Sequence, residues 1–255
     1  MNASIDRHFR LNGAHNVRDL GGYQAGDAVT QWRRLFRADA LHRLDATDID
    51  ALLEAGLRTV IDLRHAGELE QAPSPFKGSA EVRYINVSLF EQLVPTLTPG
   101  GQYADGDVLL DLYLKALALR GEAFRDVLHH IADADQGVVM FHCTAGKDRT
   151  GMIAALLLGA AGVDRDTIVA DYALTRPAIE PIVAELLADA KTRGIDPEQF
   201  SRLLVSEPAT MFATLDHIEA KHGGIAAYLS GIGVDAVTIG KLRSRLVAVN
   251  GQGEA

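Results

Sequence analysis

Hydrophobic positions in the first part of the chain fall mainly into short runs that are typical of buried strands. Such runs cover residues 57–63, 81–89 and 137–141. An earlier segment, residues 16–37, has a turn at Gly26-Asp27 and predicts a hairpin at one edge of a sheet. The pattern therefore predicts a sheet built from these four segments.

Stretches with helical character alternate with these strands. Asp45 and Thr47 are candidate caps of the first helix, which Gly56 ends. Strands alternating with helices indicate an α/β fold with a mostly parallel central sheet flanked by helices, and ligands of such sheets bind at the carboxyl ends of strands. The predicted helices lie around residues 52–54, 108–119, 123–134 and 152–158, and a polar turn region covers residues 95–106.

Beyond Gly162 the pattern is wholly helical. Residues 164–205 follow the helix around 152–158 directly, and they either cover the site as a lid or simply pack as helices. Residues 206–255 are expected to pack on the core, in a single domain of residues 1–255 without repeats or linkers. The predicted helices are 164–174, 177–193, 197–204, 208–222, 225–229 and 235–247.

Charge and composition narrow the choice of function. The net charge of -9 argues against a nucleic-acid or anionic-membrane binder. Residues 1–43 nevertheless carry seven Arg and only four Asp. These arginines either form one positive pocket for an anionic substrate or are scattered in solvent. No apolar run reaches the roughly 20 residues that span a bilayer, and residues 1–10 show no secretory signal. A single cysteine excludes intrachain disulfides and fits a reducing compartment. We expect a cytoplasmic protein.

Cys143, the single cysteine, opens a segment that reads as a phosphate cradle. It follows a strand and precedes a helix, so the amides of the turn and the positive helix end favour a thiolate and an anion in one place. Arg149 can curl back over the turn and offer a planar fork to two phosphoryl oxygens. The predicted phosphate-binding residues are Thr144, Ala145, Gly146, Lys147, Asp148 and Arg149.

The Cys-x5-Arg spacing, with His before and Thr after, is the signature of the protein tyrosine phosphatase superfamily. Residues 142–151, together with 16–22 and 59–64, resemble the bacterial tyrosine and lipid phosphatase family that includes secreted mycobacterial and listerial enzymes. The resemblance covers residues 12–245. It implies the cysteine-phosphatase fold and a phosphomonoesterase that needs neither metal nor cofactor, with Cys143 as the nucleophile of a cysteinyl-phosphate intermediate.

The resemblance also implies substrates and a proton donor. It points to phosphotyrosine proteins, with dual specificity or phosphoinositide activity as further expectations, and to inorganic phosphate as product. Asp148 is the first choice for the acid that protonates the leaving group. Asp62 is the alternative acid, unless it forms a salt bridge with Arg64, and Asp105 and Asp107 are weaker candidates.

Other residues around the predicted cradle have supporting roles. Lys147 either accepts highly anionic head groups, as the resemblance implies, or bridges to a neighbouring acidic residue. Arg18 and Asp19 are expected to brace the loop rather than touch substrate. His142 is expected to orient the cysteine through hydrogen bonds, and Thr150 can donate its hydroxyl to the thiolate.

Two other functions fit parts of this pattern. A catalytically silent phosphate- or phosphoinositide-binding module would keep the loop, but here nucleophile, arginine and loop acid are all present. A sulfurtransferase also places a cysteine at a strand-to-helix turn, yet Arg149 and Asp148 fit phosphate chemistry better. Pocket depth decides the substrate, since a deep aromatic slot favours phosphotyrosine and a wide basic bowl favours lipids.

Overall fold

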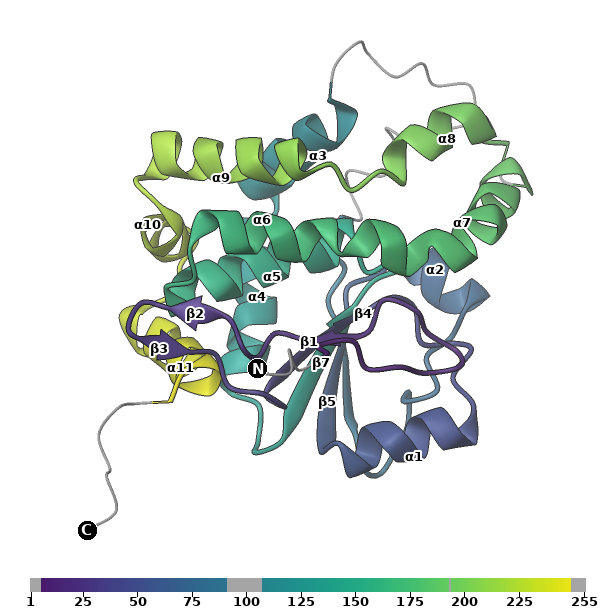
Figure 1. Cartoon of the computed structure of the whole chain (residues 1–255), viewed down its shortest axis with the longest axis horizontal. Helices are drawn as coiled ribbons and strands as arrows, with labels where there is room; N and C mark the ends of the chain where they lie inside the picture. Colours follow the sequence, from purple (N-terminus) through teal and green to yellow (C-terminus); the bar gives the residue numbers. More distant parts are fainter. Residues whose placement is uncertain (1–5, 91–106, 193, 249–255) are drawn as a thin grey trace, which may run out of the picture.

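A five-stranded, mostly parallel sheet forms the centre of the computed structural model, which describes residues 6–90, 107–192 and 194–248 (Figure 1). The strand order is β1-β4-β7-β5-β6, and only β1 runs antiparallel to its neighbour. The predicted α/β fold is thereby confirmed. The strands are β1 (Arg18–Asp19), β4 (Leu35–Ala38), β5 (Leu57–Asp62), β6 (Arg83–Asn86) and β7 (Val138–His142).

The hairpin predicted over residues 16–37 is confirmed, but it forms as two separate ladders. β1 pairs antiparallel with β4 and is the last strand of the main sheet, and β2 (Gln24–Ala25) and β3 (Ala28–Val29) pair across the Gly26-Asp27 turn in a separate two-stranded sheet. The ladder is interrupted because Gly21 and Gly22 pass against Trp32. A Cβ at Gly21 would lie 2.6 Å from Trp32 Cα, so the chain bends here instead of continuing a strand.

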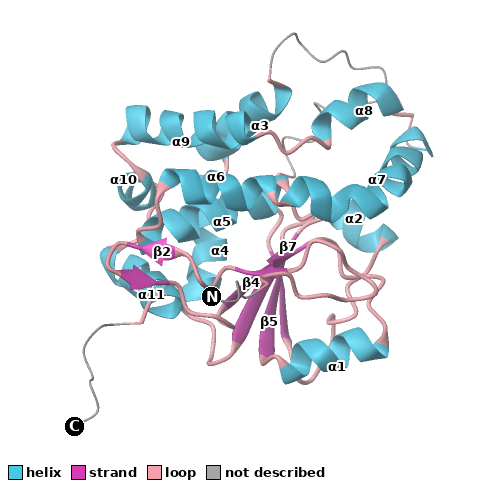
Figure 2. Cartoon of the chain, viewed as in Figure 1, coloured by secondary structure: helices cyan, strands magenta, loops and turns pink. Residues whose placement is uncertain are grey.

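Helices surround the sheet (Figure 2). Asp45, not Thr47, caps the first helix through a capping box with Asp48. The short helix α2 lies in a stretch where the sequence pattern indicated only a loop, and α7 begins two residues before Pro177. The helices are α1 (Ala46–Glu54), α2 (Ala66–Gln71), α3 (Val108–Leu119), α4 (Gly121–Ala132), α5 (Asp148–Ala161), α6 (Arg165–Ala173), α7 (Thr175–Thr192), α8 (Pro197–Leu203), α9 (Pro208–His222), α10 (Ile225–Gly231) and α11 (Ala236–Leu246).

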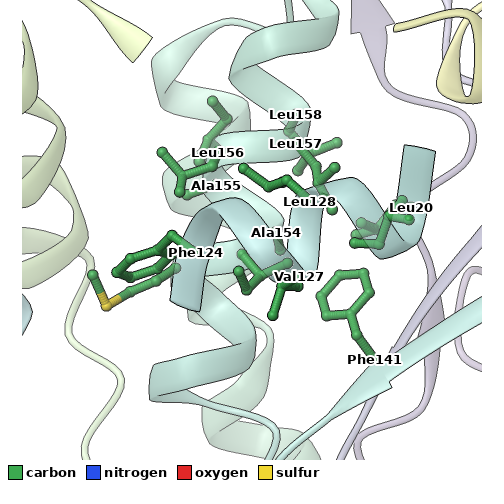
Figure 3. Packing of buried hydrophobic residues seen from close by; sticks show 14 of the residues in the cluster. Leu20, Phe124, Val127, Leu128, Phe141, Ala154, Ala155, Leu156, Leu157 and Leu158 are labelled. Carbon is green, nitrogen blue, oxygen red and sulfur yellow. The ribbon is translucent and has the colours of Figure 1, made fainter. Parts of the chain in front are cut away.

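Hydrophobic side chains bury both faces of the sheet. Along β7, Val138 and Met140 join the cluster on the α1 face, whereas Val139 and Phe141 join the larger cluster on the other face. This alternation follows from the two-residue period of a strand. On the larger side α5 is apolar nearly all round, and Figure 3 shows its residues 154–158 packed with side chains of α4 and with Phe141.

Of the helices after α5, α6 to α9 form a layer beyond the carboxyl end of β7, whereas α10 and α11 lie at one side of the molecule (Figures 1 and 2). α6 packs on α5 and α9, and α10 and α11 also contact α5. Across the described residues, no helix combines the length and apolar character needed to cross a membrane. The polar turn predicted over residues 95–106 lies outside the described residues.

Candidate active site

The loop 143–147 connects β7 to α5, which confirms the predicted strand-to-helix turn. Cys143 lies at its base and is 2% exposed. The loop must pass close to β4, because a Cβ at Gly146 would lie 2.5 Å from the carbonyl oxygen of Ala38, and Gly146 has a φ of +65°. Glycine is therefore the residue that fits at this position.

Peptide groups of this loop are fixed from behind. The carbonyl oxygens of Thr144, Ala145 and Gly146 all accept hydrogen bonds, from residues of the segment 16–40. In a planar trans peptide the N–H points away from the carbonyl oxygen. The N–H groups that follow these carbonyls therefore point to the opposite side, and with the N-terminus of α5 they form a geometry suited to an anion.

Arg149 lies on the first turn of α5 and is held by a carboxylate that sequence reasoning missed. Its Nη1 and Nη2 donate to the two carboxylate oxygens of Glu68 in α2, at 2.6 and 2.9 Å, and Thr144 Oγ1 also donates to Glu68. Burial would raise the pKa of Glu68, but the bonds and charge of Arg149 outweigh it and lower that pKa to about 2. Burial would lower the pKa of Arg149, but the hydrogen bonds and charge of Glu68 outweigh that effect and raise the pKa.

Asp148 lies at the start of α5 and is 26% exposed. Its Oδ1 accepts a hydrogen bond of 2.6 Å from the Tyr113 hydroxyl, which in turn lies 2.8 Å from the Tyr172 hydroxyl. Burial and then the Asp148 carboxylate raise the pKa of Tyr113 well above its ordinary value, so the phenol remains a donor. The contacts of Asp148 among the described residues use Oδ1, and Oδ2 takes part in none of them.

Lys147 is fully buried beneath the helical layer. Its ammonium donates to the carbonyl oxygens of Leu203 and Val205, the latter at 3.0 Å, and lies 3.2 Å from Asp148 Oδ1. The predicted bridge to a neighbouring acidic residue is confirmed. The alternative, a lysine open to anionic head groups, is not what this structure shows, because carbonyl groups at the end of α8 take up its donors.

Asp62, the alternative candidate for the acid, is held in a buried ion pair. It is fully buried and pairs with Arg64, whose Nη2 donates at 2.7 Å, which confirms the alternative of a salt bridge. Tyr84 donates to Asp62, and His142 Nε2 lies 3.3 Å from it. Burial would raise the pKa of Asp62, but His142 and Arg64 hold it well below its usual range. A carboxyl so firmly ionised is a poor proton donor.

The remaining predicted supporting residues have separate places. Arg18 lies behind the loop, whereas the Asp19 carboxylate accepts from the backbone of Gly21 and Arg33 and so braces a turn away from it. His142 Nδ1 lies 3.3 Å from the Cys143 carbonyl oxygen. The Thr150 hydroxyl is buried and has no partner among the described residues, so its predicted bond to Cys143 is not formed. Asp107 caps α3, and Asp105 is outside the described residues.

The residues around the loop to which the sequence pattern gave no role are Asn16, Arg37, Glu68, Tyr113 and Asp171. They come from segments far along the chain from residues 143–149, so no local spacing marked them, and Asp171 acts on the loop only through Arg18 and Arg37. The one available signal was the pair His65 and Glu68, whose three-residue spacing is that of a capping box, and the structure shows this box at the start of α2. It would have indicated a helix that begins close to the end of β5.

A buried thiol at the base of an anion-binding loop, with an arginine fork on the adjoining helix turn, defines the cysteine phosphatase class. The chain belongs to the tyrosine phosphatase family, whose model matches residues 9–248. The resemblance inferred from the three sequence motifs is thereby confirmed, and with it the prediction of a tyrosine phosphatase.

Individual relatives agree with this assignment. The chain is 34% identical over 224 residues to "Tyrosine-protein phosphatase" of Nostoc commune, covering 82% of this chain and 73% of that one. It is 27% identical over 277 residues to "Triple specificity protein phosphatase PtpB" of Mycobacterium tuberculosis, covering 93% of this chain and 98% of that one. A solved structure, P. aeruginosa TpbA, matches with 19% identity and a TM-score of 0.31 over 71% of this chain and 99% of that one, too low to support a conclusion.

Proposed function

We propose that Cys143 is the nucleophile, Arg149 the phosphate clamp and Asp148 the proton donor of a phosphomonoesterase that acts on phosphotyrosine proteins. The observation that carries this proposal is that one turn at the N-terminus of α5 brings together the thiol, the arginine fork and a carboxyl group with one oxygen left to carry a proton. The proton donor is thus built into the loop that binds the phosphoryl group.

The reaction has two steps. In the first, the Cys143 thiolate attacks phosphorus in line, the S–P bond forms as the bond to the leaving oxygen breaks, and Asp148 donates its proton to that oxygen. In the second, Asp148 takes a proton from water as the water oxygen attacks phosphorus, and the S–P bond breaks to release inorganic phosphate and the thiolate. Loop amides and Arg149 hold the equatorial oxygens in both steps.

The depth of the site supports phosphotyrosine as the substrate. Cys143 is 2% exposed, and aromatic side chains lie beside the reacting groups: the Phe90 ring centroid is 6.0 Å from Arg149 Cζ, and Tyr113 touches Asp148. A phosphotyrosine carries its phosphorus far enough from the peptide to reach such a base. Phosphoserine, phosphothreonine and phosphoinositides are proposed as poorer substrates, the last because the donors of Lys147 are already engaged.

Residues 164–205 are proposed to act as a lid. Two contacts support this: Lys147 of the phosphate loop binds carbonyl groups at the end of α8, and Arg43 pairs with Glu185 of α7. Substrate must then enter as these helices move aside. We place the enzyme in the cytoplasm, where the single thiol Cys143 is kept reduced.

A substrate panel on wild type and Cys143→Ser tests the proposal. Inorganic phosphate release is measured from a phosphotyrosine peptide, a phosphoserine peptide and phosphoinositide vesicles, with and without a chelator. We expect the phosphotyrosine peptide to give the highest kcat/KM, no effect of chelator, and a loss of at least about 10³-fold in Cys143→Ser.

Each other result has a definite meaning. Tight phosphate binding by wild type without turnover would indicate a silent binding module and contradict the proposal. Sulfur transfer from thiosulfate to cyanide would indicate a sulfurtransferase. Higher kcat/KM on phosphoinositide vesicles than on the phosphotyrosine peptide would overturn the substrate assignment while keeping the chemistry.

A further inference from the structure

A buried cluster of charged residues lies directly behind the phosphate loop. Asp171 of α6 accepts from Arg18 Nε at 3.1 Å, from the Tyr23 hydroxyl at 2.8 Å and from Arg37 Nη1. The side chains of Arg18, Arg37 and Asp171 are at most 1% exposed. Burying three charges costs much free energy unless they are paired and their hydrogen bonds are satisfied.

The cluster has one more positive than negative charge. Burial and then the charge of Arg37 lower the pKa of Arg18 to about 10, which still leaves its guanidinium protonated at neutral pH. Burial would raise the pKa of Asp171, but Arg18 and Arg37 hold it well below its usual range. Two cations therefore face one anion, and the surplus charge lies next to the loop.

Arg37 connects this cluster to the loop directly. Its Nη2 donates to the Gly146 carbonyl oxygen at 2.9 Å, while its Nη1 binds Asp171. The loop has no room to shift toward β4, as the close approach of Gly146 to Ala38 shows. Arg37 thus fixes the orientation of the peptide that joins Gly146 to Lys147.

Asn16 connects the cluster to the loop a second time. Its Nδ2 donates to the carbonyl oxygens of Ala145 and Gly146, at 2.9 and 3.2 Å, and Arg18 Nη1 donates to its Oδ1. The arginine thereby determines which end of the amide faces the loop. Because Asp171 holds both Arg18 and Arg37, one carboxylate orders both connections.

We propose that Asn16, Arg37 and Asp171 are positioning residues that turn the loop carbonyls away from the site, so that the N–H groups of Gly146 and Lys147 receive the oxyanion. This inference rests on the proposed function only in taking that oxyanion to be a phosphoryl group. The surplus charge of the cluster adds an attraction for the same anion.

The sharpest test is Asn16→Asp. This variant keeps the size of the side chain and its contact with Arg18, and it neutralises the surplus charge. A carboxylate oxygen would then face the two carbonyl oxygens, so a positioning role predicts that the loop peptides turn and lose affinity for an anion while the chain stays folded. Tungstate binding to the Cys143→Ser chain should weaken about 10- to 100-fold when Asn16→Asp is added.

Arg37→Lys is the second variant. One ammonium can keep the charge opposite Asp171 but cannot match the planar fork that also holds Gly146. We expect weaker tungstate binding by about 10-fold and slower alkylation of Cys143 by iodoacetamide at pH 6 in the otherwise wild-type chain. Arg34→Lys is the matched control. Arg34 lies three residues before Arg37 and its side chain binds Gln31, so this variant should change neither tungstate binding nor the alkylation rate.

The readouts separate this inference from the proposed function, since tungstate binding and alkylation need no turnover. If the wild-type chain turned over no phosphate ester, the proposed activity would be contradicted. If Asn16→Asp and Arg37→Lys nevertheless weakened tungstate binding, the positioning role would still be supported. Folded Asn16→Asp and Arg37→Lys chains with wild-type tungstate affinity and alkylation rate would overturn it. Should one variant fail to fold, the other decides by the same measurements.

Discussion

Two groups of carboxylates and arginines hold the phosphate loop from opposite sides, and they differ in charge balance and in access to solvent. In front, Glu68 and Arg149 form a one-to-one pair whose side chains are 19% and 14% exposed. Behind, Asp171 faces two arginines with almost no exposure. A balanced, accessible pair can share its arginine with an incoming phosphoryl group, whereas a sealed, unbalanced cluster cannot touch that group and acts on it only through the shape of the loop and its surplus charge.

The geometry of the front pair supports this difference. Arg149 uses Nη1 for one bond to Glu68 and Nη2 for a second to Glu68 and a third to Thr144 Oγ1. A guanidinium has five N–H groups, so two of them have no acceptor within the part of the chain that the structure describes and can bind substrate. The rear cluster satisfies most of its donors within the protein. Mutations in front should therefore change catalysis more than stability, and mutations behind should change both.

Removing the rear carboxylate should have the largest effect. Asp171→Asn leaves two buried arginines without their anion, and breaking a buried ion pair in this way costs about 3–5 kcal/mol. Chemical denaturation of wild type and variant measures the free energy of unfolding. Asp166→Asn, an exposed position on the same helix, is the control and should change it by less than about 0.5 kcal/mol. If Asp171→Asn were as stable as Asp166→Asn, the rear cluster would not be needed to hold the fold together.

Changing the front arginine should chiefly lower the rate. Arg149→Lys keeps a positive charge but loses the fork, and we expect kcat to fall about 10²- to 10³-fold while stability falls by no more than about 1 kcal/mol. Steady-state kinetics with a phosphotyrosine peptide and a denaturation curve measure the two quantities. Arg165→Lys, whose partner Asp216 lies away from the loop, should behave like wild type. A stability loss as large as that of Asp171→Asn would contradict the comparison.

Acid should weaken the front pair in a defined range. The pKa of Glu68 is lowered in the folded state from 4.5 to about 2, so its contribution is fully present above pH 4.5 and is lost as the pH falls toward 2. Asp171 and Asp62 also have lowered pKa values and add to the same loss. Between pH 5 and pH 2.5, the free energy of unfolding should fall by about 1–2 kcal/mol less in Glu68→Gln than in wild type. Identical pH dependence in both chains would show that the pair contributes nothing.

The part of the site that could be predicted from sequence is the part made by neighbours in the chain. Cys143, Asp148 and Arg149 lie within one turn, and their spacing fixes how they meet. The same holds for most helices, because caps such as Asp45 are local. The expected strand over residues 81–89 forms only over Arg83–Asn86, since its ends depend on pairing with β5.

What could not be predicted depends on long-range contacts. Glu68 and Lys147 reach partners far along the chain, Arg149 and Leu203 among them. Nothing in the sequence near Lys147 shows that carbonyl groups at the end of α8 will bind its ammonium. Asp171 similarly looks like any helical acid until the fold places two arginines beside it. Such groups become visible only once the sheet order and the helical layer are known.

The most direct test of whether Cys143 carries the phosphoryl group between the two steps is mass spectrometry of the wild-type chain, quenched rapidly in denaturant during turnover of a phosphotyrosine peptide. We expect a mass increase of one phosphoryl group on the peptide that contains Cys143. A phosphoryl group on another residue, or undiminished turnover in Cys143→Ser, would contradict it.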